Sequence, residues 1–493
     1  MKDFSCGNAI FARLQMKRWI VILTIVAAWA CSGVIESTSP APETPTITDS
    51  GAEASRFEAV INFGVKGPME SITECGVSYG LNGVYSETTG SLEKETGLCT
   101  VIVKNLYPGT TYSYRCFIGN GRNRLYSEEK TFSTESYGGN DGRSYDEVTL
   151  TAAGTLQEVL QQAGLDAGQV VNLRISGPVN DDDFVFMRDM MTVLEAVDME
   201  NCTTEDNRIP KKAFTGKRSL KSFVFPKSTE KIGGLAFQNT NLSGKLILPA
   251  GLKEIENSKS EWSNGPGAFG CTLITDIEFP PGLEIIGDGA FCGCRGLAVQ
   301  FKLPEGVKRI GVAAFTSCSF SGKLELPSSI EILEYECFRE SGKYQGGLVI
   351  PPLIKEIPAE CFYGCEYQGT LDLGSCTSIG EDAFLFNQFS GALVVPEGVT
   401  EIPRQCFSNN SFTSISLPST LTRIMSSAFA FRVELESVSC KAHNPPMVLY
   451  DSAFGSDKQR SHCVLEVPES SLDLYKEAPY WKDHFLEIKA CAN

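Results

Sequence analysis

Histidine is scarce in this chain, which has three among its 493 residues. All three lie near the carboxyl end, at His443, His462 and His484. Histidine is the usual general base and metal ligand near neutral pH, so its scarcity argues against an enzyme that depends on either role. A glycine-rich phosphate loop and a paired-acid motif are missing as well. We therefore predict no catalytic residues, no cofactor and no enzyme, although an acid pair assembled from separate segments stays open.

Positive charge is also in deficit. Lysine and arginine total 43 against 60 aspartate and glutamate residues, and the formal net charge is -17. Recognition of nucleic acid requires a basic patch or stripe, and the sequence shows none. We therefore expect no nucleic-acid partner.

Long hydrophobic runs are lacking too. The apolar run from Trp19 to Ala28 is too short to cross a bilayer. Because Lys17 and Arg18 precede this run, residues 1–31 have the pattern of an export signal. The protein is therefore expected to leave the cytoplasm.

The end of that run, Ala30-Cys31, resembles the signal of bacterial lipoproteins. The resemblance implies that Cys31 carries a lipid, that the protein is anchored in the outer membrane, and that this anchor is its one contact with a membrane. Trp29 departs from the pattern, which takes a small residue there, and ordinary secretion with cleavage nearby is the alternative. Both Met1 and Met16 fit as the first residue.

What the sequence has in abundance is an internal repeat. A small residue followed by phenylalanine recurs at intervals of 22 to 25 residues, with one interval of 32. The phenylalanines are Phe214, Phe237, Phe269, Phe291, Phe315, Phe338, Phe362, Phe384, Phe407, Phe429 and Phe454. This period falls within the roughly 20 to 29 residues of leucine-rich repeats, whose units bury their apolar faces only against neighbouring units. We predict a solenoid with one β-strand and a turn or short helix in each unit.

Units such as LPEGVKRIGVAAFTSC, at residues 303–318, resemble the BspA-like leucine-rich repeats of bacterial surface proteins. The resemblance covers the repeats at 201–466, and the tail at 467–493 is similar to the carboxyl-terminal unit of that family. Three aromatic residues of this cap are expected to roof the last open layer: Tyr475, Tyr480 and Trp481. The resemblance implies attachment to host or matrix proteins and glycans, not catalysis.

Three residues after most of the phenylalanines stands a small polar residue or cysteine. These positions, which we call the polar ladder, are Thr240, Thr272, Cys294, Cys318, Ser341, Cys365, Asn387 and Asn410. A small inward polar group can satisfy turn backbone that would otherwise be buried without a partner. The ladder also accounts for several of the 18 cysteines, so no metal site is predicted at Cys292 with Cys294 or at Cys361 with Cys365. Disulfides stay open in an exported protein.

The apolar-polar-apolar triplet before each proline predicts which side chains point outward, because side chains alternate along a strand. Leu324 and Leu326 are expected in the core and Glu325 outside. The aligned triplets give a candidate binding column: Ile247, Glu278, Lys302, Glu325, Val349, Asp372, Val394, Ser416 and Ser439. The other interpretation of this column is a solvated sheet face. An alternative binding loop is the long unit that contains Trp262.

Residues 46–135 show short alternating runs between glycine and proline turns, after a tether at 32–45 that is rich in serine, threonine and proline. This pattern predicts a small all-β sandwich of the immunoglobulin or fibronectin type III kind. The segment LYPGTTY at Leu106–Tyr112 resembles the tyrosine corner of fibronectin type III domains. The tryptophan common in their second strand is missing, and Phe57 or Phe63 is expected to take its place.

A second linker at 136–147 leads into residues 148–200, the predicted amino-terminal cap of the solenoid. Helices are expected at 155–162 and 184–191. Three acids, Asp181–Asp183, precede the second helix, but successive acids lack the alternating spacing of a calcium loop. We interpret them as a helix cap with favourable charge.

These features predict a non-enzymatic cell-surface protein that binds an external protein or glycan through the solenoid. The alternative is a periplasmic or envelope scaffold that binds partner proteins of the same cell. Both functions need an exported solenoid with a rigid, extended surface, so the sequence does not separate them.

Overall fold

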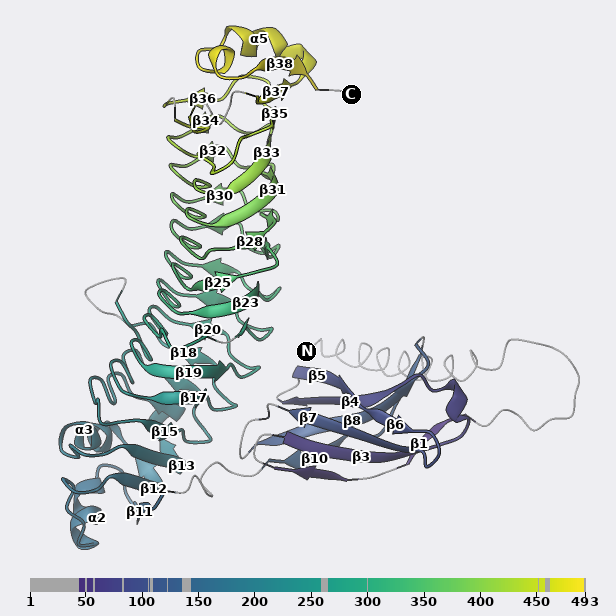
Figure 1. The fold of residues 1–493 in the computed structure, drawn as a ribbon. Helices are drawn as coiled ribbons and strands as arrows, with labels where there is room; N and C mark the ends of the chain where they lie inside the picture. Colours follow the sequence, from purple (N-terminus) through teal and green to yellow (C-terminus); the bar gives the residue numbers. More distant parts are fainter. Residues whose placement is uncertain are drawn as a thin grey trace, which may run out of the picture.

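The computed structural model describes residues 44–491, apart from 49–50, 56–57, 82–83, 105, 107–109, 122, 135–142, 259–264, 299, 451 and 457–461, and the side chain of residue 301. Residues 1–31 with Cys31, most of the tether, Phe57, Trp262 and part of the LYPGTTY segment therefore lie outside the described residues. The described chain forms an antiparallel β-sandwich followed by a long solenoid of parallel strands (Figure 1).

The sandwich consists of two antiparallel sheets. One sheet contains β1 (Thr46–Thr48), β2 (Ala52–Ala54), β3 (Glu58–Lys66), β6 (Ser91–Glu93) and β7 (Leu98–Lys104). The other contains β4 (Glu74–Leu81), β5 (Val84–Thr89), β8 (Thr111–Gly119), β9 (Arg124–Tyr126) and β10 (Lys130–Ser133). A disulfide between Cys75 and Cys99 joins the two sheets. Phe63 is fully buried between the sheets, and Tyr112 stacks on Phe132 with ring centroids 5.5 Å apart.

The solenoid begins at β11, one residue before the predicted end of the linker at 147. One side of the solenoid, which we call the long-strand face, carries strands of two to nine residues. They are β11 (Asp146–Thr149), β12 (Asn172–Val179), β13 (Ala196–Thr204), β15 (Ser222–Val224), β17 (Ser243–Ile247), β19 (Leu273–Glu278), β21 (Gln300–Lys302), β23 (Phe320–Glu325), β25 (Gly342–Tyr344), β26 (Leu348–Val349), β28 (Gln368–Gly369), β29 (Leu371–Asp372), β31 (Gln388–Val394), β33 (Ser411–Leu417), β35 (Ser437–Cys440), β37 (Val464–Val467) and β38 (Glu487–Ala490). All pairings between them are parallel, as in a chain that winds in one direction.

A second set of two-residue strands forms the short-strand face. These strands are β14 (Arg208–Ile209), β16 (Lys231–Ile232), β18 (Glu254–Ile255), β20 (Ile285–Ile286), β22 (Arg309–Ile310), β24 (Ile332–Leu333), β27 (Glu356–Ile357), β30 (Ser378–Ile379), β32 (Glu401–Ile402), β34 (Arg423–Ile424) and β36 (Met447–Val448). The expectation of one strand with a turn or short helix was therefore incomplete. Tight turns carry the phenylalanines, and Ala313 and Ser317 beside Phe315 have φ of 52° and 55°. Such left-handed residues interrupt helical hydrogen bonding.

The eleven phenylalanines stack into a single column through the solenoid core. Each is at most 1 % exposed. Neighbouring rings are nearly parallel, with centroids 5.2 to 5.8 Å apart. Every ring between Phe214 and Phe454 thus packs on the rings of the preceding and the following unit. This arrangement confirms that each repeat buries its apolar face against its neighbours.

The polar ladder runs beside this column and serves the turn backbone, as predicted. Asn387 Nδ2 donates to Phe362 O at 2.8 Å and to Phe384 O at 3.0 Å, so one amide joins two successive units. Cys365 Sγ donates to Phe338 O at 2.8 Å. All eight ladder residues are at most 6 % exposed, and an unpaired carbonyl at that depth is costly. The ladder is therefore a structural device of the repeat.

The amino-terminal coil carries the helices α2 (Leu156–Gln162) and α3 (Asp181–Asp189). Asn180 is the N-cap of α3 and forms a reciprocal capping box with Asp183. Asp183 is buried, and its carboxylate also accepts hydrogen bonds from Gly154 N at 2.7 Å and Leu156 N at 3.0 Å. The three acids therefore form the first turn of the helix instead of preceding it, and the N-cap is Asn180. Asp183 completes the capping box and links the two helices through backbone amides.

The carboxyl-terminal segment covers the last layer of the solenoid. It contains α5 (Leu472–Glu477) and the 3₁₀ turn at Trp481–Asp483. The Trp481 ring packs on Phe454, the last phenylalanine of the column, with centroids 5.9 Å apart. Its Nε1 donates to Pro446 O at 2.9 Å, and Tyr475 OH donates to Ala442 O at 2.9 Å. Both aromatic side chains are buried and hydrogen-bonded, so they close the open end.

Candidate binding surfaces

The candidate binding column lies on the long-strand face of the solenoid. Each of its nine residues has another member as its direct partner on a neighbouring strand. These partners are Ile247 with Glu278, Lys302 with Glu325, Val349 with Asp372, Val394 with Ser416, and Ser416 with Ser439. The structure therefore aligns residues of successive units, each pair being 22 to 31 positions apart in the sequence.

The column continues into both caps, which sequence reasoning missed. Ser439 pairs with Glu466, and Glu466 pairs with Lys489, whose Nζ lies 3.2 Å from the Glu466 carboxylate. At the other end Arg174 pairs with Asp198 and makes an ion pair with it at 2.9 Å. The triplet before a proline was the signal for the column, and it is complete at Leu465–Val467 before Pro468, so the sequence could have identified Glu466. The strands of Arg174, Asp198 and Lys489 lack the proline.

The middle of the column is the part most open to solvent. Val349 and Val394 are 60 % and 56 % exposed, far more than valine in a protein core. Glu325 and Asp372 are exposed as well, whereas Ser416 is half-buried. This stretch therefore presents apolar side chains beside carboxylates on one flat row.

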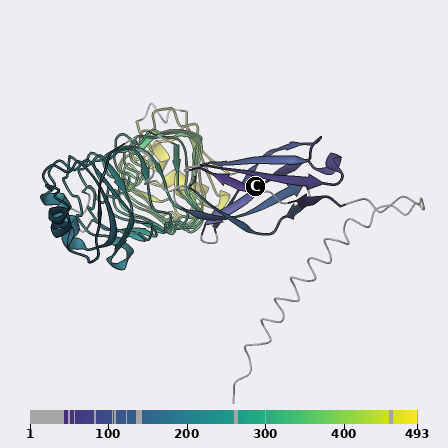
Figure 2. The same ribbon diagram turned by 90° about the horizontal axis from the view of Figure 1, so that it is seen from below.

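The amino-terminal end of the column faces the sandwich instead of solvent. Ile247 and Ala250 pack against the sandwich core, which lies beside β17 and β19 (Figures 1 and 2). Burial raises the pKa of the Glu278 carboxyl, while Lys245 at 3.2 Å opposes that rise. Burial, together with the charge of Glu278, raises the pKa of Tyr79 in the sandwich. Ile247 and Glu278 thus belong to an interface within the chain.

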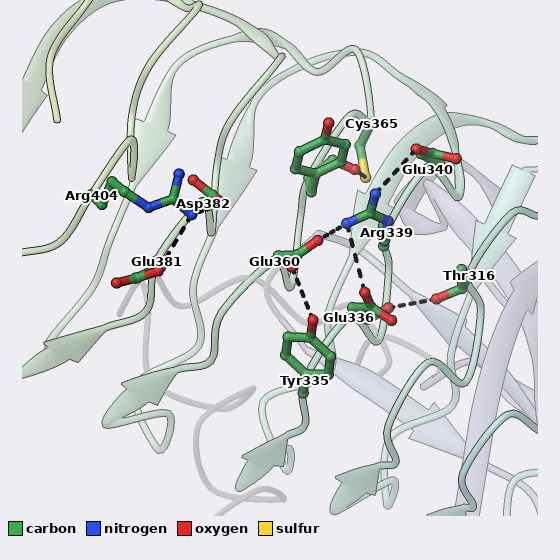
Figure 3. Close-up of polar contacts among 11 residues, drawn as sticks. Thr316, Tyr335, Glu336, Arg339, Glu340, Glu360, Cys365, Glu381, Asp382 and Arg404 are labelled. Carbon is green, nitrogen blue, oxygen red and sulfur yellow. Dashed lines mark hydrogen bonds and ion pairs between the residues drawn. The ribbon is translucent and has the colours of Figure 1, made fainter. Parts of the chain in front are cut away.

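A second group of polar residues lies at the turns of neighbouring units, and we call it the arginine cluster: Tyr335, Glu336, Arg339, Glu360, Asp382 and Arg404 (Figure 3). Arg339 makes an ion pair with Glu360, lies 3.6 Å from Glu336, and stacks on the Tyr363 ring at 4.1 Å. Tyr335 OH donates to Glu360 Oε1 at 2.9 Å. The contacts with Glu360 and Tyr363 join adjacent units, whereas the contact between Arg339 and Glu336 lies within one unit.

Asp382 is the remaining acidic residue of the arginine cluster, and its carboxylate also pairs with an arginine. Arg404 lies 2.9 Å from Asp382 and 3.4 Å from Glu381. Burial raises the pKa of Asp382, but Arg404 and Arg339 both oppose the rise. Arg404 engages Oδ2 of Asp382, while Oδ1 is buried and has no hydrogen-bond partner among the described residues. The cluster therefore fits a role in tying repeats together.

The cysteines near the turns are arranged as buried thiols. Cys294 Sγ donates to Phe269 O at 3.1 Å, which is the geometry of the polar ladder. Burial raises the pKa of Cys294 and that of Cys365 to about 12 each, so both remain protonated and poor metal ligands. Among the residues that the structure describes, no group of three histidine, cysteine, aspartate or glutamate side chains is placed to hold a metal ion.

Cys31 and Trp262, the predicted lipidation site and the alternative binding loop, lie outside the described residues. Within the described ranges, no helix is both long and apolar enough to cross a membrane.

The parallel strands, the stacked phenylalanines and the polar ladder define a leucine-rich repeat solenoid. Six copies of the BspA type leucine-rich repeat region match the chain, at residues 194–261, 263–388 and 355–457. These matches cover more than half of the sequence, and the chain belongs to the BspA-type leucine-rich repeat family. No curated protein matches the chain.

Proposed function

We propose that this chain is a non-enzymatic, exported binding protein that recognises an external protein or glycan through its long-strand face. One observation carries the proposal: the exposed row from Glu325 to Ser439, in which Val349 and Val394 stand beside Asp372. Parallel strands repeat at about 4.8 Å, so the row presents these groups at regular intervals on a rigid support. Exposed apolar groups with charged neighbours are typical of protein recognition surfaces.

The exposed valines favour recognition of an external partner over a purely solvated face, because solvation alone does not favour large apolar side chains. An envelope scaffold that binds proteins of the same cell uses the same chemistry and is the alternative. Digestion of intact cells with an external protease separates the two. A surface protein is cleaved, whereas a protein that faces the periplasm is cleaved only after the outer membrane is opened.

The proposed anchor is a lipid on Cys31, with the tether and a fibronectin type III-like sandwich as the spacer between membrane and solenoid. Wild-type protein is then expected in the membrane fraction, and Cys31→Ala releases it into the soluble fraction. Wild-type protein that is wholly soluble would contradict the anchor.

The binding surface is tested by reversing two charges of the row. Intact cells that carry the double variant Glu325→Lys and Asp372→Lys are expected to bind immobilised matrix proteins and glycans less, with altered salt dependence. The matched control reverses the charges of Glu331 and Glu356, two exposed acids on the short-strand face. This control is expected to leave binding unchanged.

A third variant, Trp262→Ala, tests the rival loop. Binding that is lost in Trp262→Ala and retained in the double variant of the row would move the site to the long unit. It would also leave the candidate binding column as a solvated face.

A further inference from the structure

A cleft of about 600 Å³ opens where the sandwich meets the first coils of the solenoid. Its walls are Thr110 of the sandwich, Arg143 of the connecting segment, and residues of β13, β15 and β17. Small-molecule sites commonly occupy roughly 300 to 1,000 Å³ and occur often between domains. The cleft is thus of a size for a small ligand, and it lies apart from the exposed row at Glu325 to Ser439.

Cationic side chains dominate the charged lining of this cleft. Arg143, Lys221, Lys227 and Lys245 line it, with Glu200 as the acidic residue among the lining residues. The whole chain carries a formal charge of -17, so this concentration of positive charge runs against the rest of the molecule. Such a lining favours an anionic ligand.

The lysines have acidic neighbours, but these pairs are weak competitors for a ligand. Lys221 lies 2.6 Å from Glu195, and the two side chains are 50 % and 42 % exposed. Lys245, whose side chain is 36 % exposed, lies 3.2 Å from Glu278 and 4.0 Å from Asp276. Lys227 lies 3.5 Å from Glu200, which is buried. Ion pairs in contact with water contribute roughly 0 to 1 kcal/mol. The ammonium group of Lys221 can therefore turn toward a ligand carboxylate at little cost, whereas Lys245 reaches a ligand while it still pairs with Glu278.

The uncharged lining suits a sugar. Hydroxyls of Thr110, Ser222 and Ser243 supply hydrogen-bond donors and acceptors, and the half-buried Val224 and Ile247 supply apolar surface. A Cβ placed on Gly244 would meet nothing within 4 Å, so this part of the wall is open. Sugar rings present hydroxyls at their edges and aliphatic carbons on their faces, which matches both kinds of lining.

We propose that this cleft binds an acidic oligosaccharide, with sugar carboxylates at Lys221 and Lys245 and sugar hydroxyls at the serine and threonine side chains. This second site does not depend on recognition by the exposed row. Lys221 directly precedes β15, Lys245 lies in β17, and Arg143 belongs to the connecting segment. The charge therefore approaches the ligand from more than one element.

Isothermal titration of the purified protein with a uronic-acid trisaccharide tests the proposal, with the neutral hexose trisaccharide and triglutamate as comparisons. We expect the uronic-acid sugar to bind, to weaken as salt is raised, and to bind more tightly than both comparisons. No binding of that sugar overturns the proposal. Tighter binding of triglutamate overturns the ligand class in favour of an acidic peptide.

Variants locate the site. Lys221→Gln with Lys245→Gln is expected to lower affinity for the uronic-acid sugar at least tenfold, and Lys221→Gln alone covers the case in which the double variant is unstable. The matched control, Lys253→Gln with Lys308→Gln, removes two lysines paired with Glu230 and Glu284 at 2.6 and 2.7 Å outside the cleft. Equal affinity in the cleft and control variants would overturn the assignment.

The charge reversals at Glu325 and Asp372 separate this site from the proposed function. They are expected to leave the affinity for the uronic-acid sugar within twofold of wild type. Loss of sugar binding in that variant places the sugar on the exposed row and overturns the cleft.

Discussion

Replacing Asn410 by alanine tests how much the polar ladder contributes to the solenoid. Asn410 is fully buried, and its Nδ2 donates to Phe384 O and to Phe407 O, each at 2.9 Å. Its Oδ1 accepts from Phe389 N at 3.1 Å. After the change Phe384 O keeps the amide of Asn387 at 3.0 Å, whereas Phe407 O and Phe389 N lose the Asn410 side chain.

The two buried backbone groups set the expected magnitude. Each unsatisfied buried group costs roughly 1 to 3 kcal/mol, so Asn410→Ala is expected to lower the free energy of unfolding by about 2 to 6 kcal/mol. Asn241→Ala is the matched control, because the bond from Asn241 Nδ2 to Arg218 O, at 2.6 Å, is exposed to water. Its expected effect is about 1 kcal/mol or less.

Urea denaturation followed by circular dichroism measures the loss, and hydrogen exchange locates it. The amide of Phe389 is expected to exchange faster in Asn410→Ala, whereas the amide of Tyr367, which donates to Asn387 Oδ1 at 3.1 Å, keeps its protection. Repeat proteins unfold in segments, so the local measurement is the decisive one. A loss below about 1 kcal/mol with unchanged exchange at Phe389 would refute the reasoning.

Two further predictions concern the carboxyl-terminal cap and the sandwich interface. Trp481→Ala removes a side chain that is 1 % exposed and packs on Phe454, so a loss of about 3 to 5 kcal/mol and faster amide exchange in the last strands are expected. Tyr450→Ala, at a side chain that is 55 % exposed, is its control, and equal losses in both variants would contradict the capping role. Burial raises the pKa of Glu278 above its usual 4.5, so the folded protein holds a proton there more tightly than the unfolded chain does. The stability that this protonation contributes is lost as the pH rises from 4.5 through the folded pKa. The melting temperature of Glu278→Gln relative to wild type is expected to increase between pH 4 and pH 7, and a pH-independent difference would show that Glu278 is not buried by the sandwich.

The sequence determined the repeat register by itself. The contacts that stabilise a solenoid join each unit to the next, so every structural position recurs at the repeat period and can be read from the spacing. Phe338 and Asn387 take their predicted places in the core for this reason. The outward position of Glu325 follows from the alternation of side chains along a strand.

Only the tertiary structure decided what each part of the solenoid surface faces. Ile247 and Glu278 occupy the same column as Val349, yet the sandwich packs on Ile247 and leaves Val349 60 % exposed. The cleft likewise joins Thr110 to Lys245 across two domains. These contacts occur once in the chain and leave no periodic signal, because they depend on how two folded surfaces fit together. The sequence repeat specifies the conformation of each solenoid unit, whereas contacts between the sandwich and the solenoid form only after both domains have folded.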